Sequence, residues 1–102
     1  MQPDLNQMMR QAAKMQREME RIQEELNKTP VEGSAGGGAV KVTCTGAIEF
    51  IKIKLSPEAV DPNDIETLED LILTAIKDAS QKAKDLAQGK MGKLQLPPGL
   101  GF

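Results

Sequence analysis

The chain has 102 residues, the size of a single domain. Hydrophobic residues make up 39% and charged residues 27%, as in an ordinary globular protein, but there are two Phe and neither Tyr nor Trp. Histidine is absent and there is one cysteine, which excludes an internal disulfide and a thiolate-cluster zinc site and removes the commonest general base. We therefore expect no enzyme activity, no catalytic residues, no metal site, no cofactor and no small-molecule substrate.

No stretch approaches the roughly 18 consecutive apolar residues that a membrane span needs. Residues 1–4 lack the basic and apolar regions of a secretory signal, so we expect a cytoplasmic protein without membrane contact. The net charge of −2 is unevenly distributed, because residues 56–88 carry eight acidic groups and three lysines. This charge argues against indiscriminate binding of nucleic acid but permits a local basic surface.

Residues 4–28 contain neither Gly nor Pro and are rich in helix-forming residues, which predicts a helix roughly 37 Å long. That length exceeds what a 102-residue domain requires, so part of the helix should project or lie against another helix. Apolar residues recur along it at a and d heptad positions, and we expect this apolar seam to pack in the core or between two subunits. The apolar seam consists of Leu5, Met8, Ala12, Met15, Met19, Ile22 and Leu26.

Residues 30–55 predict a three-stranded antiparallel meander. Pro30 ends the first helix, and residues 31–38 read as a short strand that leads into a glycine turn. Residues 39–45 alternate, with Val40, Val42 and Cys44 on one face. The third strand, residues 48–55, has Ile48 and Phe50 out of phase with its other apolar residues, so we expect a bulge or a second buried patch near Phe50.

The last helix is expected over residues 62–88. Asp61 is a good N-cap and Pro62 suits the first helical position. Gly89 and Gly92 should end the helix, and residues 89–102 are rich in Pro and Gly and are expected to be flexible. The expected fold is therefore α+β, with the order α-β-β-β-α in one domain over residues 1–102.

Five basic residues lie in an arc of roughly 60° on the first helix, nearly opposite the apolar seam. They form a basic ridge about 27 Å long, which corresponds to roughly eight base pairs of duplex DNA. The pattern by itself favours a solvated face, with Arg17 paired to Glu20 and Arg21 paired to Glu24 or Glu25. The basic ridge consists of Arg10, Lys14, Arg17, Arg21 and Lys28.

Three other features are interpreted structurally. Residues 33–38 lack the Lys-Ser or Lys-Thr pair and the helix that follow a phosphate-binding loop, so they predict a hairpin turn. Cys44 has no histidine to activate it and is expected to be a small core residue. The acidic residues at the start of the last helix are expected to interact favourably with the helix dipole rather than to act as an acid and base pair. They are Glu66, Glu69 and Asp70.

Several segments, in order along nearly the whole chain, resemble the YbaB/EbfC family of bacterial nucleoid-associated proteins. The first helix contributes two of them, residues 8–16 and 23–26. Residues 31–42, with Gly46 after the next strand, continue the similarity. The remaining matches are Leu68-Glu69-Asp70-Leu71, Asp78-Ala79 and Leu96-Pro97-Pro98-Gly99.

This resemblance implies a tweezer-like homodimer whose long helices project from joined sheets, and binding of double-stranded DNA in the nucleoid. In the family, DNA contacts are assigned to the first and last helices. Carried over, they fall on the basic ridge and on Lys82 and Lys84, although the acidic surplus of residues 56–88 disfavours contact along the whole last helix.

A competing hypothesis is a non-enzymatic adaptor that docks a partner protein through the apolar seam. The methionines of the seam would suit such an adaptable groove, although core or dimer packing explains them more simply. The two hypotheses differ in their response to salt, because DNA binding weakens steeply as salt rises and apolar docking does not.

Overall fold

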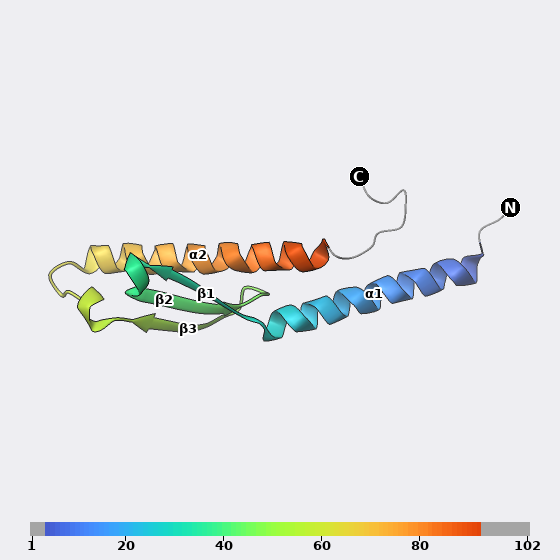
Figure 1. The fold of residues 1–102 in the computed structure, drawn as a ribbon, viewed down its shortest axis with the longest axis horizontal. Helices are drawn as coiled ribbons and strands as arrows, with labels where there is room; N and C mark the ends of the chain where they lie inside the picture. The colour runs from blue at the N-terminus through green and yellow to red at the C-terminus, as the bar shows by residue number, and fades with distance from the viewer. Residues whose placement is uncertain (1–3, 93–102) are drawn as a thin grey trace.

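The computed structural model describes residues 4–92, which form an elongated α-β-β-β-α fold measuring 75 × 24 × 16 Å. Its radius of gyration of 20.2 Å exceeds the roughly 13 Å of a compact 100-residue domain. Figure 1 shows the reason: the first helix, α1, leads away from the sheet, whereas the last helix, α2, lies along the sheet. The predicted fold class and element order are confirmed.

Helix α1 spans Leu5–Lys28, as the sequence predicts to within one residue. The Asp4 carboxylate caps its start by accepting a hydrogen bond from the Asn6 backbone N–H at 3.0 Å. At the other end, the helix stops at Thr29, whose hydroxyl donates to the Glu25 carbonyl at 2.6 Å. Pro30 then begins the first strand, which fixes where the projecting helix meets the sheet.

Three antiparallel strands follow, β1 (Pro30–Ala35), β2 (Val40–Thr45) and β3 (Phe50–Leu55), in the spatial order β1-β2-β3. The predicted glycine turn is present as the short 3-10 helix η1 (Gly36–Gly38), whose three residues all have positive φ. The predicted bulge is also present: the β2–β3 register shifts where Cys44 pairs with Phe50.

The third strand begins two residues later than residue 48, the predicted start. Ile48 has a φ of 62°, which places it in the turn before β3 and not in the strand. The Thr45 hydroxyl stabilises that turn by accepting hydrogen bonds from the N–H groups of Ala47 and Glu49.

Helix α2 spans Ile65–Met91, so the predicted bounds of 62–88 are wrong at both ends. The N-cap is Asp64, which accepts a hydrogen bond from the Thr67 N–H at 3.3 Å, and Asp61 instead closes a separate turn through its carbonyl. A second 3-10 helix, η2 (Pro57–Ala59), precedes that turn. Gly89 lies inside the helix, and Gly92 follows its end. The rest of the predicted flexible tail, residues 93–102, lies outside the described residues.

The core lies between α2 and the sheet. Val40, Val42 and Cys44 are fully buried against three alanines that recur every four residues along α2, namely Ala75, Ala79 and Ala83. Gly33 permits this close approach, because a Cβ atom there would lie 2.2 Å from the Ala79 backbone nitrogen. Small side chains therefore bring α2 onto β1 and β2, and α1 is held only near its end.

Candidate nucleic-acid interface

The apolar seam of α1 is divided between a buried end and an exposed end. Ile22 and Leu26 are buried, and the Gly46 backbone N–H donates to the Leu26 carbonyl at 2.9 Å. Leu5 and Met8, at the far end, are 68% and 53% exposed, and Met19 is also exposed. The seam thus anchors the last turns of α1 to its own chain, and the first turns extend past the sheet as Figure 1 shows.

The basic ridge is exposed over its whole length. Four of its five residues form no ion pair within residues 4–92, so their charges are not offset by a contacting carboxylate. The expected pair between Arg17 and Glu20 is not found there. These four cations are Arg10, Lys14, Arg17 and Lys28.

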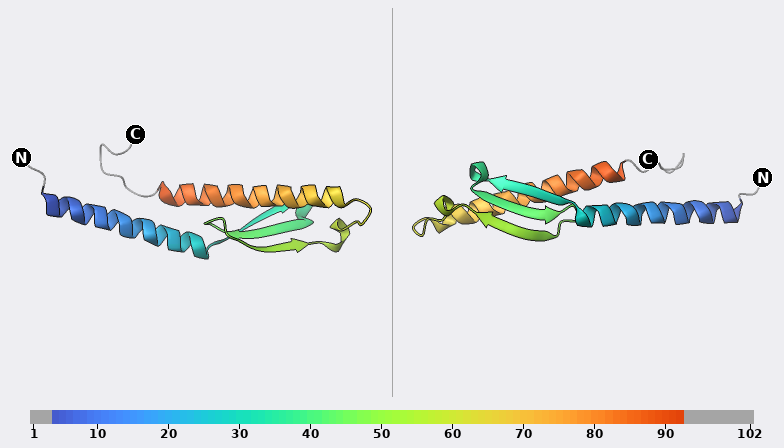
Figure 2. Two further views of the ribbon diagram at one scale, coloured as in Figure 1. Left: turned by 180° about the vertical axis from the view of Figure 1, so that it is seen from behind. Right: turned by 60° about the horizontal axis from the view of Figure 1, so that its bottom comes forward.

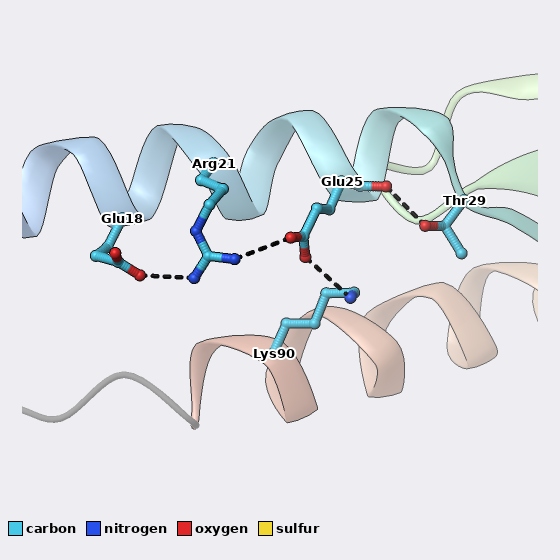
Figure 3. A network of polar contacts seen from close by, with 5 residues as sticks. All are labelled: Glu18, Arg21, Glu25, Thr29 and Lys90. Atoms are coloured by element: carbon cyan, nitrogen blue, oxygen red, sulfur yellow. Dashed lines mark hydrogen bonds and ion pairs between the residues drawn. The ribbon is translucent and has the colours of Figure 1, made fainter.

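Arg21, the fifth residue of the ridge, is paired as Figure 3 shows. Its guanidinium lies 2.6 Å from the Glu18 carboxylate and 3.0 Å from that of Glu25, and Glu25 also contacts Lys90 of α2 at 3.2 Å. The pKa of Glu18 is lowered by its hydrogen bond with Arg21 and by the charge of that guanidinium. The pKa of Glu25 is lowered first by the hydrogen bond and charge of Lys90 and then by those of Arg21. This network ties α1 to α2, and it leaves the Arg21 guanidinium paired, unlike the other four cations of the ridge.

The two candidate lysines of α2 differ in their surroundings. Lys82 lies 3.1 Å from Asp78, and its ammonium group donates to the Glu32 carbonyl at 3.3 Å. Asp78 in turn accepts a hydrogen bond from the Ser34 N–H at 3.0 Å, which is the first cause of its lowered pKa. Lys82 and Asp78 therefore form hydrogen bonds with backbone groups of β1, which is an edge strand. Lys84 is exposed and forms no ion pair within the described part of the chain.

The end of the molecule opposite α1 is acidic. A hollow of about 330 Å³ lies there, and Glu58, Asp61 and Asp64 contribute to its lining. The three acidic residues that the sequence analysis interpreted as dipole-stabilising lie exposed in the first two turns of α2 beside it. The negative potential of this end disfavours anionic ligands there. No cluster of metal ligands is found in residues 4–92.

Cys44 lies in the core, fully buried, and its Sγ lies 3.7 Å from the Ala79 carbonyl oxygen. Burial raises the pKa of its thiol, so the neutral form is favoured. Cys44 therefore fits the structural role that the sequence analysis predicted. In the described part of the chain, neither helix is long and apolar enough to cross a bilayer.

An apolar surface on β3 was not predicted from the sequence. Helix α2 packs against β1 and β2, and the apolar residues of the third strand remain exposed. The strand alternation was visible in the sequence, but the sideways offset of α2 that uncovers this strand was not. We call this surface the β3 strip, and it consists of Phe50, Ile51, Ile53 and Leu55.

The sequence of this chain is similar to that of a known protein family and to those of bacterial nucleoid-associated proteins. The family described as the YbaB/EbfC DNA-binding family matches residues 1–97. A nucleoid-associated protein of Chloroflexus aggregans is 53% identical over 88 residues, which cover 86% of this chain and 88% of the relative. Another, from Corynebacterium jeikeium, is 47% identical over 102 residues and covers 99% of this chain and 98% of the relative.

The fold is similar to that of a solved structure. An uncharacterized protein from Helicobacter pylori superposes with a TM-score of 0.78 at 19% sequence identity. The similarity covers 89% of this chain and 96% of that protein. At this low identity the comparison supports the arrangement of helices and strands.

Proposed function

Because the chain belongs to the YbaB/EbfC DNA-binding family, we propose that it acts as an architectural nucleoid-associated protein that holds duplex DNA along the basic ridge of α1. The observation that carries this proposal is the row of exposed cations that have no ion-pair partner within residues 4–92. Helix α1 presents this row on the part of the molecule that extends beyond the sheet. The same proposal includes a regulatory role and a location in the cytoplasmic nucleoid. It also includes the absence of enzyme activity.

The active form in this proposal is a homodimer. The β3 strip lies on an edge strand, and an exposed apolar edge strand is suited to pairing with another chain. A second copy that covers the β3 strip would add apolar burial to a core built from valine, cysteine and alanine. The same association would join two sheets and present two basic ridges, one from each protomer.

The contacts to DNA are proposed to be made largely to phosphate groups. Arginine and lysine contacts to phosphate carry no sequence information, although Arg10 or Arg17 could also reach a guanine edge. Base stacking is disfavoured, because Phe50 and Phe102 are the only aromatic residues in the chain. We therefore expect modest sequence preference and substantial non-specific affinity.

A salt titration with several duplexes tests this proposal. Wild-type protein should bind all of them with a log–log salt slope of about −3 to −5, because carboxylates beside the ridge reduce the number of counterions released. Arg10→Ala/Arg17→Ala should weaken binding to every duplex and flatten the slope while the protein remains folded, since both side chains are exposed. Equal affinity and an unchanged slope in this variant would place any DNA elsewhere on the molecule.

Sedimentation equilibrium tests the homodimer separately. At micromolar concentration, the mass should be twice the 11.1 kDa of one chain. Ile53→Asp would bury a charge in the proposed interface and should shift the mass toward one chain. A wild-type monomer throughout this concentration range would contradict the dimer.

The adaptor hypothesis remains a second candidate because the first turns of the apolar seam are exposed. An adaptor would bind its partner through Leu5 and Met8, and its affinity would change little with salt. If Met8→Ser abolished binding of a partner protein and left the affinity for DNA unchanged, the adaptor hypothesis would be favoured over DNA binding.

A further inference from the structure

The open face of the sheet carries a second group of cations. Lys41 of β2 and Lys54 of β3 are direct cross-strand partners. Lys52, two residues along β3, is the direct partner of Thr43. All three lysines are exposed, and we call this group the lysine face.

The strand register places the lysine face on the side away from α2. Val40 and Val42 alternate with Lys41 and are buried against α2, so Lys41 lies on the opposite face of β2. Directly paired residues share a face, which puts Lys54 and Lys52 there as well. The right-hand view of Figure 2 shows this open side, with the sheet in front of α2.

This arrangement costs stability in the isolated chain. Like charges directly opposite each other on neighbouring strands destabilise a sheet, and Lys41 and Lys54 are such a pair. None of the three ammonium groups forms an ion pair within residues 4–92. The acidic strand residue on this face, Glu32 of β1, pairs with Thr43 and is the diagonal neighbour of Lys41, but it forms no ion pair with Lys41 within residues 4–92.

The chemistry of the lysine face selects an anionic ligand. An interface that buried three ammonium groups without partners would carry a large desolvation penalty, so the face is poorly suited to apolar association. Phosphates would relieve the repulsion between the lysines, and they can be bound at a surface that stays accessible to water. The β3 strip can be covered by a second copy of the chain without burying this face, because Ile53 and Leu55 share the other face with Val42 and Val40.

We propose that the lysine face is a second DNA-contacting surface, at which Lys41, Lys52 and Lys54 bind phosphates of duplex DNA in addition to the basic ridge. This proposal rests on the proposed function, since it requires that the protein bind duplex DNA. It gives the sheet, as well as the projecting helix, a part in holding the nucleic acid.

The test replaces the lysine face by neutral residues in the full chain. Lys41→Gln/Lys52→Gln/Lys54→Gln should lower affinity for a 30-base-pair duplex by about tenfold or more at 50 mM salt and flatten the salt slope by about one unit per contacting lysine. Its melting temperature should be equal to or above that of wild type, because the Lys41–Lys54 repulsion is removed. Lower affinity for DNA together with an equal or higher melting temperature would show that a DNA contact is lost while the fold is intact.

Two control variants complete the experiment. Lys41→Arg/Lys52→Arg/Lys54→Arg keeps the charges and should retain wild-type affinity. Lys77→Gln removes an exposed lysine of α2 and should change affinity by less than about twofold, as expected for a charge that contacts no phosphate.

The outcomes distinguish the two proposals. If the glutamine triple variant binds with wild-type affinity and slope while Arg10→Ala/Arg17→Ala loses affinity, the lysine face is not a DNA surface and the proposed function stands. If wild-type protein binds no duplex at 50 mM salt, both proposals are wrong. If the glutamine variant weakens and the arginine variant does not, the lysine face is confirmed.

Discussion

Helices α1 and α2 have similar lengths, 24 and 27 residues, but they are used in opposite ways. Helix α2 buries a row of alanines against the sheet, and its Lys82 and Asp78 occupy the edge of β1. Helix α1 buries Ile22 and Leu26 at one end and leaves most of its cations without ion-pair partners in the described chain. The side chains that pack α2 against the sheet are therefore different from the exposed cations of α1. Substitutions in the first group should change stability, and substitutions in the second should change surface charge.

The largest effect on stability is expected where α2 meets β1. In Gly33→Ala, the new Cβ would meet the backbone of Ala79, so the strand or the helix must move, and the free energy of unfolding should fall by about 3 kcal/mol. Met9→Ala, at an exposed position of α1, should change it by less than about 0.5 kcal/mol. Urea denaturation of both variants measures this difference, and equal losses would contradict the assigned packing roles.

A smaller effect is expected at Cys44, which contacts α2 from the sheet. Cys44→Ala removes a buried sulfur, and we expect a loss of about 1 kcal/mol in the free energy of unfolding with unchanged affinity for DNA. Thermal melts and binding titrations on the same preparation measure both quantities. A folded Cys44→Ala protein that failed to bind DNA would show that the cysteine has a role beyond packing.

The smallest effect is expected at the exposed network between the two helices. Lys90 lowers the pKa of Glu25, so the stabilisation from this pair is present above the ordinary glutamate pKa of about 4.3 and is lost as pH falls through the lower folded-state value. Wild type should be slightly more stable than Glu25→Gln at pH 7, and the difference should shrink as pH falls below the ordinary glutamate pKa. A difference that stayed constant throughout an acid titration would mean that the ion pair is not its source.

Much of the fold could be predicted from local signals. The absence of Gly and Pro before Thr29-Pro30 set the bounds of α1, and the phase change near Phe50 indicated the bulge. The start of α2 was misplaced because Asp61 and Asp64 are both plausible caps, and only the tertiary structure decides that Asp61 closes a separate turn. The helix continues through Gly89, where the cost of glycine, about 1 kcal/mol, does not end it.

The candidate site could be predicted only in part. Spacing along one helix is enough to find the basic ridge, because residues three or four apart share a face. Local spacing also predicts the pairing of Arg21 with Glu25 on its own helix. The contacts of Glu25 with Lys90 and of Lys82 with the Glu32 carbonyl join different elements, so the sequence could not predict them. The lysine face and the β3 strip depend on strand register and on where α2 crosses the sheet, and neither has a local signal.

The central claim is that DNA is held mainly by α1 and not by α2. It is tested most directly by removing two exposed charges from each helix and measuring affinity for one duplex at one salt concentration. Arg10→Ala/Arg17→Ala should weaken binding by about tenfold or more, whereas Lys77→Ala/Lys84→Ala should weaken it by less than about threefold. A loss in the α2 variant that equals or exceeds the loss in the α1 variant would contradict the claim.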